Sequence, residues 1–351
     1  MAYTTINKST DYFNTKLYTG NGSTQSITGV GFQPDFCWFK RRDTGASNHA
    51  LQDAVRGVTK FIQSNTTSAE ATSSNYLTSF NSDGFSLAGD GDVNENNANH
   101  ASWNWKANGA GSANTDGTIS STVSASATSG FSIVSYTGTG SLATVGHGLG
   151  VAPAMIIMKN RSTTNGWEVY HQSLGNTRYM QLHSTSVGGT SATRWNNTSP
   201  TSTVFTVNTE GGVNSSGGNL IAYCFAEKQG YSKFGRFTAN GSTNNTFVYT
   251  GFKPAFVMMK CDNVTDSWSK WYMFDTARSP ENMNVKELEA NTTAVESSSG
   301  ANYAQIDMLS NGFKLRNGSA WGPASNGNTN IYMAFAEAPL VGTNGVTAKA
   351  R

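Results

Sequence analysis

Two short motifs place a carboxylate three residues before an arginine, a spacing at which acid–base chemistry is conceivable. They are Asp53-Ala54-Val55-Arg56 and Asp275-Thr276-Ala277-Arg278. A carboxylate beside an arginine is also a low-cost way to keep both groups charged when they are partly buried. We therefore predict that each motif is a structural ion pair that fixes a loop. No residue is assigned a catalytic role.

Two loops carry side chains that metals use as ligands. The loop Asp90-Gly91-Asp92-Val93-Asn94-Glu95-Asn96-Asn97 is rich in carboxylates and amides, but it lacks the glycine and the distal glutamate of an EF-hand loop. His147 lies in the loop Gly146-His147-Gly148-Leu149-Gly150, and the five histidines share no ligand spacing. The sequence predicts a solvated hairpin loop for the first and a plain loop histidine for the second, with no metal and no cofactor.

Cysteines and tryptophans also have simple structural interpretations. Cys37, Cys224 and Cys261 form neither a CxxC motif nor an even set, which favours three small buried residues. Five tryptophans could stack against sugar rings, although most are expected in a β-sandwich core: Trp167, Trp195, Trp268, Trp271 and Trp321. Walker loops, GxSxG elbows, HExxH helices and dinucleotide fingerprints do not occur in the sequence, so an enzyme is not predicted.

The composition predicts a folded, β-rich protein with many turns. Charged residues make up 13% of the 351, about half the usual fraction, while 37 residues are glycine and 11% are aromatic. The formal net charge is +2 and the longest basic run is Lys40-Arg41-Arg42, which disfavours nucleic acid as a partner. The first residues lack the pattern of a signal peptide, and no run of 18 apolar residues occurs, so we expect neither export nor membrane insertion.

The elements that position these residues follow from an internal repeat. One pattern occurs three times: a proline, five largely apolar residues, and a lysine six positions after the proline. The copies are Pro34 to Lys40, Pro153 to Lys159 and Pro254 to Lys260. Each predicts a buried strand that the proline begins, and the lysine is expected to mark where the strand returns to water.

Further landmarks recur in the same order. Each copy closes on an aromatic-rich strand, as in Trp103-Asn104-Trp105 and Ala222-Tyr223-Cys224-Phe225 and Met333-Ala334-Phe335. The first and third copies also share the Asp-x-x-Arg motif and a segment, Asn65 to Glu70 and Asn291 to Glu296, whereas the second copy has His171-Gln172-Ser173-Leu174 at the place of the motif.

These repeats define the predicted domains. We expect three tandem β-sandwiches at residues 1–108, 131–230 and 231–340. Residues 109–130, rich in Gly, Ser, Thr and Ala, are predicted to be a flexible or extended linker. Residues 341–351 are predicted to be a surface tail or docking strand. The core is expected to contain Phe36, Trp38, Trp105, Ile157, Phe225, Phe256 and Phe335.

The residues that carry the repeat resemble an uncharacterised family of β-sandwich repeat proteins from tailed phages of marine bacteria, which have tail-fibre-like or lectin-like descriptions. The resemblance rests on Asp11 to Ser23, Tyr223 to Glu227, Gly230 to Gly235 and Tyr332 to Pro339, and covers nearly the full length. It implies an all-β fold of three tandem concanavalin-like or jelly-roll β-sandwich repeats and a location in the virion after synthesis in the host cytoplasm, and it transfers no catalytic residue.

Three functions follow as alternatives. The first is a tail-associated fibre or a receptor-binding or glycan-binding component exposed on the particle. The second is a capsid decoration protein, which gains weight because the sequence shows neither coiled-coil heptads nor a β-helix from which to build a shaft. The third, a glycan-degrading depolymerase, is least favoured because paired carboxylates do not recur at matched positions. Expected partners are other virion proteins, host surface glycans and further copies of this chain.

Overall fold

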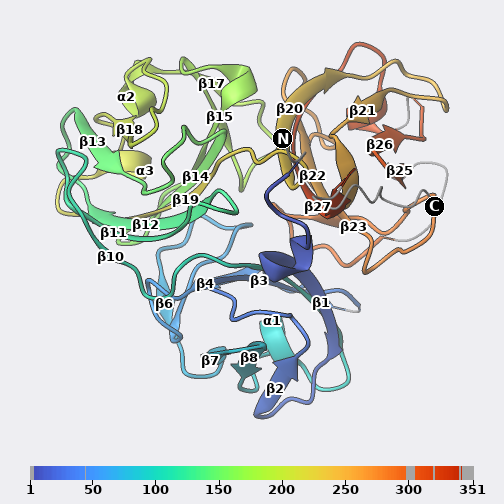
Figure 1. Ribbon diagram of the computed structural model, residues 1–351, viewed down its shortest axis with the longest axis horizontal. Coiled ribbons are helices and arrows are strands. Elements are labelled where there is room, and N and C mark those ends of the chain that lie inside the picture. Colours follow the sequence, from blue (N-terminus) through green and yellow to red (C-terminus); the bar gives the residue numbers. More distant parts are fainter. Residues whose placement is uncertain (1–3, 44, 298–304, 319–320, 340, 342–351) are drawn as a thin grey trace.

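The computed structural model describes residues 4–43, 45–297, 305–318, 321–339 and 341, and they form three lobes around a common centre (Figure 1). Strands dominate every lobe, so the predicted all-β class is confirmed. The helical segments are single turns at the ends of loops. They are η1 (Ser9–Asp11), α1 (Gly91–Asn94), η2 (Gln172–Leu174), α2 (Ala192–Trp195), α3 (Gly211–Asn214) and η3 (Gly322–Ala324).

The first repeat has a larger and a smaller antiparallel sheet. The larger sheet has the order β1 (Phe13–Thr19), β9 (Asn99–Trp105), β3 (Phe36–Arg41) and β4 (Ala50–Asp53). The smaller sheet has the order β2 (Gln25–Thr28), β8 (Gly84–Leu87) and β7 (Leu77–Asn81). A separate two-stranded ribbon joins β5 (Lys60–Phe61) and β6 (Ala71–Thr72).

The second repeat follows the same plan with a longer sheet. Its order is β10 (Ser112–Asn114), β11 (Ser121–Ser126), β12 (Phe131–Thr137), β19 (Asn219–Phe225), β14 (Met155–Asn160), β15 (Trp167–His171), β16 (Arg178–Gln181) and β17 (Gly189–Thr190). The smaller sheet pairs β13 (Ala143–Gly146) with β18 (Val204–Val207).

The third repeat again pairs a larger with a smaller sheet. The larger one has the order β20 (Ser232–Thr238), β27 (Thr329–Pro339), β22 (Phe252–Cys261), β23 (Trp271–Asp275) and β24 (Leu288–Glu289). The smaller one has the order β21 (Phe247–Tyr249), β26 (Gly312–Leu315) and β25 (Ile306–Leu309).

Strand order and register agree among the three larger sheets. The strand after each proline pairs with the last aromatic strand of its repeat, so that Phe36 faces Trp105, Met155 faces Phe225, and Phe256 faces Phe335. The division into three repeats remains a prediction from the sequence, and this shared register supports it.

Apolar side chains form two kinds of core. One cluster fills the centre and takes residues from all three repeats, while three smaller clusters each lie within one repeat. Alternation along each strand explains both, because successive side chains of the larger sheets point to opposite faces. The seven predicted core residues are confirmed, since each is at most 3% exposed: Phe36, Trp38, Trp105, Ile157, Phe225, Phe256 and Phe335.

Residues 109–130 differ from the predicted linker. Strands β10 and β11 extend the second repeat's larger sheet, and Ile119 forms a parallel bridge with Val145 of the smaller sheet. Ile119 and Val123 are buried in that repeat's own cluster. The segment is extended, which is one of the two predicted alternatives. It is not a mere linker, because Ile119 and Val123 contribute to the core of the second repeat. A few apolar residues suffice there because the existing sheet supplies the rest of the apolar surface.

Candidate functional site

Each repeated proline stands two residues before the residue that faces the last aromatic of its repeat: Phe36, Met155 and Phe256. Pro34 and Pro153 stand two residues before β3 and β14 begin. Pro254 does not begin its strand as predicted, because β22 already starts at Phe252. Register shifts flank Pro254 on both sides, so the ladder is interrupted where its missing N–H would be needed.

The three repeated lysines are buried, which contradicts the prediction that they return to water. Lys40, Lys159 and Lys260 are each 0% exposed. Every ammonium donates to one main-chain carbonyl of its own repeat and to one of a neighbouring repeat. The pairs are Ser47 at 2.6 Å and Thr293 at 3.1 Å for Lys40, Asn165 at 2.5 Å and Thr67 at 2.9 Å for Lys159, and Ser269 at 2.5 Å and Thr185 at 2.8 Å for Lys260. The lysines therefore join repeats.

Burial has a direct electrostatic cost at these positions. It lowers the pKa of Lys40, Lys159 and Lys260 from the usual 10.5 to about 8 in each case. Carbonyl dipoles, rather than a carboxylate, are the hydrogen-bond acceptors of each ammonium, which offsets desolvation only in part.

Ring nitrogens make a second set of equivalent contacts. His49 Nε2 lies 3.0 Å from the Glu289 carbonyl oxygen. Trp167 Nε1 donates to the Gln63 carbonyl at 2.9 Å, and Trp271 Nε1 donates to the Gln181 carbonyl at 3.0 Å. At each interface the ring and the buried lysine belong to the same repeat. The carbonyl that the ring contacts and the carbonyl that the lysine contacts both belong to the same neighbouring repeat.

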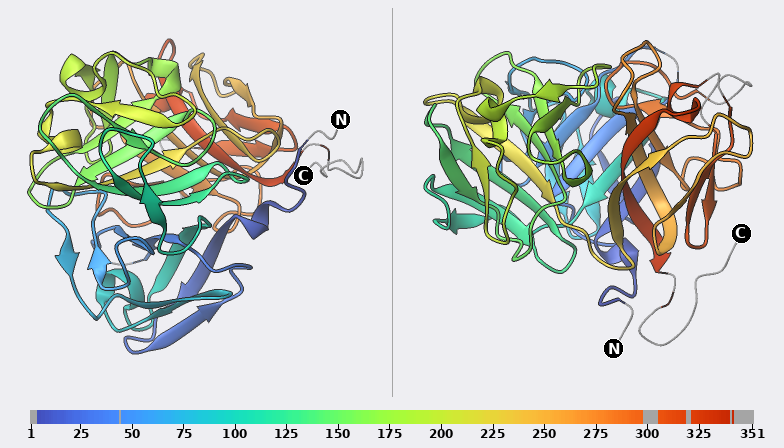
Figure 2. Two further views of the ribbon diagram at one scale, coloured as in Figure 1. Left: turned by 60° about the vertical axis from the view of Figure 1, so that its left-hand side comes forward. Right: turned by 90° about the horizontal axis from the view of Figure 1, so that it is seen from above.

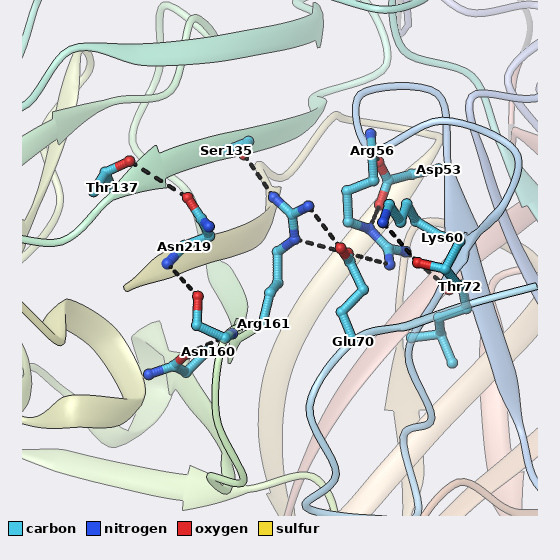
Figure 3. A network of polar contacts seen from close by, with 12 residues as sticks. Asp53, Arg56, Lys60, Glu70, Thr72, Ser135, Thr137, Asn160, Arg161 and Asn219 are labelled. Carbon is cyan, nitrogen blue, oxygen red and sulfur yellow. Dashed lines mark hydrogen bonds and ion pairs between the residues drawn. The ribbon is translucent and has the colours of Figure 1, made fainter. Parts of the chain in front are cut away.

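The first Asp-x-x-Arg motif is part of a polar network between the first and second repeats (Figure 3). Arg56 Nε and Asp53 Oδ2 lie 2.5 Å apart with both side chains fully buried. Tyr223 of the second repeat donates its hydroxyl to Asp53 at 2.8 Å. Glu70 then links Arg56 at 3.2 Å to Arg161 at 2.8 Å.

The third repeat builds the same network against the first. Arg278 Nε lies 2.5 Å from Asp275 Oδ2, again with both side chains fully buried. Trp103 Nε1 donates to Asp275 at 3.0 Å. Glu296 bridges Arg278 at 3.1 Å and Arg42 at 2.8 Å.

The contact between the second and third repeats uses other residues. His171, at the position of the two aspartates, lies with its Nε2 3.1 Å from the Tyr332 carbonyl oxygen. Asp262, two residues after Lys260, accepts from Arg236 at 2.7 Å and lies 3.6 Å from Arg178. In the first and second repeats, the residue two positions after the repeated lysine is an arginine, Arg42 or Arg161, and the neighbouring repeat supplies the carboxylate. In the third repeat the same position holds the carboxylate of Asp262, and the neighbouring repeat supplies the cation.

Sequence comparison found part of this site. It singled out Asp53, Arg56, Asp275 and Arg278 and the shared segments that end at Glu70 and Glu296, but not the arginines opposite them. Their spacing is a usable signal, because Arg42 and Arg161 each stand eight residues after the repeated proline. The structure brings these residues together at interfaces and not around one open cleft.

The two other candidate loops have structural roles. Asp90 caps α1 by accepting from the Asp92 amide, so Gly91–Asn94 within the predicted hairpin loop form a short helix. His147 is buried, with Nε2 3.2 Å from the Thr201 carbonyl oxygen. All three cysteines are free and buried, as predicted. Among the described residues, no group of three or more His, Cys, Asp or Glu side chains is placed to hold a metal ion.

Taken together, these features define a class: an all-β protein whose three lobes share a central core and meet through polar contacts. The chain belongs to the family described as "Domain of unknown function (DUF7483)", whose model matches residues 8–339. No curated protein matches the chain. In the part of the chain that the structure describes, no helix has the length and apolarity needed to cross a membrane.

Proposed function

We propose that the protein is a structural component exposed on a bacteriophage particle, tail-associated and acting by binding rather than by catalysis. The observation that carries this proposal is the closed arrangement of the repeats, which imitates a trimer within one polypeptide. Heterologous contacts that return to their starting unit close a ring. A ring of this kind supplies three related but separately variable outer surfaces for neighbours or host glycans.

The fate of the charged groups also favours binding over catalysis. Asp53, Arg56, Asp275 and Arg278 are fully buried and pair with one another inside the interfaces. A catalytic carboxylate has to reach its substrate. The burial and the ion pairing of these four residues therefore support a structural role for them.

Capsid decoration is the second candidate, and the outline of the molecule favours it. The three lobes form a compact body without an elongated projection among the described residues (Figure 2). A long fibre needs a shaft, whereas a decoration protein needs only a rigid footprint.

Copy number on purified particles distinguishes the two candidates. Quantitative gel densitometry and cryo-electron microscopy of the phage that encodes the chain should show a few to a few tens of copies at the tail. Hundreds of copies on the head would establish decoration instead. Absence of the protein from purified particles would refute both candidates.

The terminal segments are the proposed points of attachment. Residues 1–11 and 341–351 are the segments concerned; residues 1–3 and 342–351 lie outside the described residues. Thr10 and Ala336 line one small hollow, so the segment before β1 lies beside the end of β27. Deleting both segments should abolish incorporation into particles, and full occupancy without them would show that the sheet surfaces attach the protein.

A further inference from the structure

A hollow of about 360 Å³ lies on the third repeat, where the connection from the second repeat meets the turn after β21. Tyr249 lines it and is 55% exposed. Glu227, Gln229 and Lys233 are the charged and amide side chains of the lining. The hollow thus combines an exposed aromatic ring with several groups that can form hydrogen bonds.

A second exposed ring lies next to Tyr249. Phe247 is 41% exposed and stands two residues away on β21, and therefore on the same face of the strand. Phe247 also covers Gly312 of the adjacent strand β26, where a Cβ atom would come within 3.0 Å of its ring. The two rings therefore form one aromatic strip on the smaller sheet of the third repeat.

The other repeats show that the fold does not require this strip. The middle residue of each equivalent strand faces a buried phenylalanine: Val248 faces Phe313, Ile27 faces Phe85, and Val145 faces Phe205. This register aligns Phe247 and Tyr249 with Ser26 and Thr28 of the first repeat, and with Thr144 and Gly146 of the second. The same sheet is built twice without exposed aromatic residues there, so these rings need another explanation.

The chemistry around the strip fits a sugar. An aromatic face packs against the C–H face of a pyranose ring, while nearby polar side chains bond the hydroxyl groups at its rim. Glu227 and Lys233 form an ion pair at 2.6 Å and are 33% and 37% exposed, so each retains room for a hydroxyl partner. Because their charges cancel, the hollow does not select for an anionic ligand.

We propose that this hollow binds a neutral glycan, with Tyr249 as the stacking platform and Phe247 as its extension along the chain of sugars. The proposal rests on the proposed function, because it locates the receptor contact of an exposed particle component. It assigns binding to the third repeat and leaves the equivalent surfaces of the first and second repeats without this activity.

The test replaces the aromatic strip with the residues that the first repeat has at the same positions. The double variant Phe247→Ser/Tyr249→Thr keeps side chains that the sheet already accommodates. Wild-type protein is screened on an array of neutral bacterial polysaccharides and of malto-, laminari- and galacto-oligosaccharides, and the affinity for each hit is measured by calorimetry. We expect at least one hit, with affinity reduced about tenfold or more in the double variant.

A matched control removes an exposed ring elsewhere. Trp268 is 41% exposed on another loop of the same repeat, and Trp268→Ser should bind the glycan like the wild type. Thermal unfolding of all three proteins checks that folding is unchanged. The proposal is overturned if no neutral glycan binds, if only anionic glycans bind, or if the double variant retains wild-type affinity.

Particle incorporation separates this proposal from the proposed function. Phage that encode the double variant should carry the protein at normal occupancy while adsorbing poorly to host cells. Wild-type protein missing from particles would refute the virion assignment even if the glycan site is real. Normal occupancy together with normal adsorption and normal glycan affinity would refute the site alone.

Discussion

Each interface between repeats buries one lysine whose ammonium has carbonyl partners, and this makes stability depend on pH in the alkaline range. Below about pH 8 the lysine is charged in both the folded and the unfolded state, and folding bears the full desolvation cost. Between about pH 8 and the unfolded pKa of 10.5, the unfolded chain holds a proton that the folded protein has released. The contribution of each lysine to the free energy of unfolding therefore rises with pH in this window.

Lys159→Met tests that contribution. The unfolding free energy of the wild type minus that of the variant should increase by about 1 kcal/mol per pH unit between pH 8 and 10. The reason is that only the wild type releases the lysine proton on folding. Burial raises the pKa of several tyrosines and cysteines, which lowers the stability of both proteins as the pH rises. This effect is common to the two proteins and cancels in the difference. Urea titrations at several pH values measure it, and parallel curves for the two proteins would contradict the assignment.

Histidines impose the opposite limit, at acid pH. Burial lowers the pKa of all five: His49, His100, His147, His171 and His183, and that of His171 falls to about 4. As the pH falls below 6.5, the unfolded chain gains protons that the folded protein does not, so stability is lost. From pH 7 to 5, the stability of the wild type relative to His171→Gln should fall by about 2 kcal/mol. A constant difference between the two proteins would show that His171 titrates normally in the folded state.

Strand β27 contributes a large aromatic side chain to the shared core. Phe335 lies within ring contact of Phe13, Trp105 and Phe225, which belong to the other two repeats, at centroid distances of 5.0, 5.7 and 6.1 Å. Phe335→Ala should therefore lower the unfolding free energy by about 3–5 kcal/mol, since the surrounding rings cannot all move into the cavity. Phe247→Ala, at a position that is 41% exposed, is the control and should change it by less than half as much. Equal effects of the two changes would contradict the shared core.

Individual elements also show how far sequence patterns determine this structure. The short apolar runs after Pro34 and Pro153 predict the buried strands found there. A strand whose sheet is covered on both faces needs apolar residues at successive positions. The fate of Lys40 does not follow, because the Thr293 carbonyl that accepts from it is remote in sequence and becomes a neighbour only when the ring closes. The contribution of segment 109–130 to a core does not follow for the same reason: Ile119 packs against a sheet formed by later residues.

At the scale of the whole molecule, the contacts of the repeated lysines run in one direction around the ring. Lysines of the first, second and third repeats donate to the third, first and second repeats, respectively. The same order holds for the ring nitrogens of His49, Trp167 and Trp271. Through these two sets of contacts, each repeat is donor to one neighbour and acceptor from the other. Removing any repeat leaves both remaining ones with an unsatisfied interface.

This closure predicts that the repeats fold only together. The inner face of each larger sheet is covered by residues of the other two repeats, so an isolated repeat would expose the aromatic side chains of the central cluster to water. The full chain should unfold in a single calorimetric transition whose van't Hoff and calorimetric enthalpies agree. Residues 109–230 expressed alone, with β10 and β11 included, should bind a hydrophobic dye and lack dispersed amide signals in NMR spectra. A folded, monomeric second repeat, or separate transitions for the three repeats in the full chain, would mean that the small clusters suffice for folding and that the central core only joins finished units.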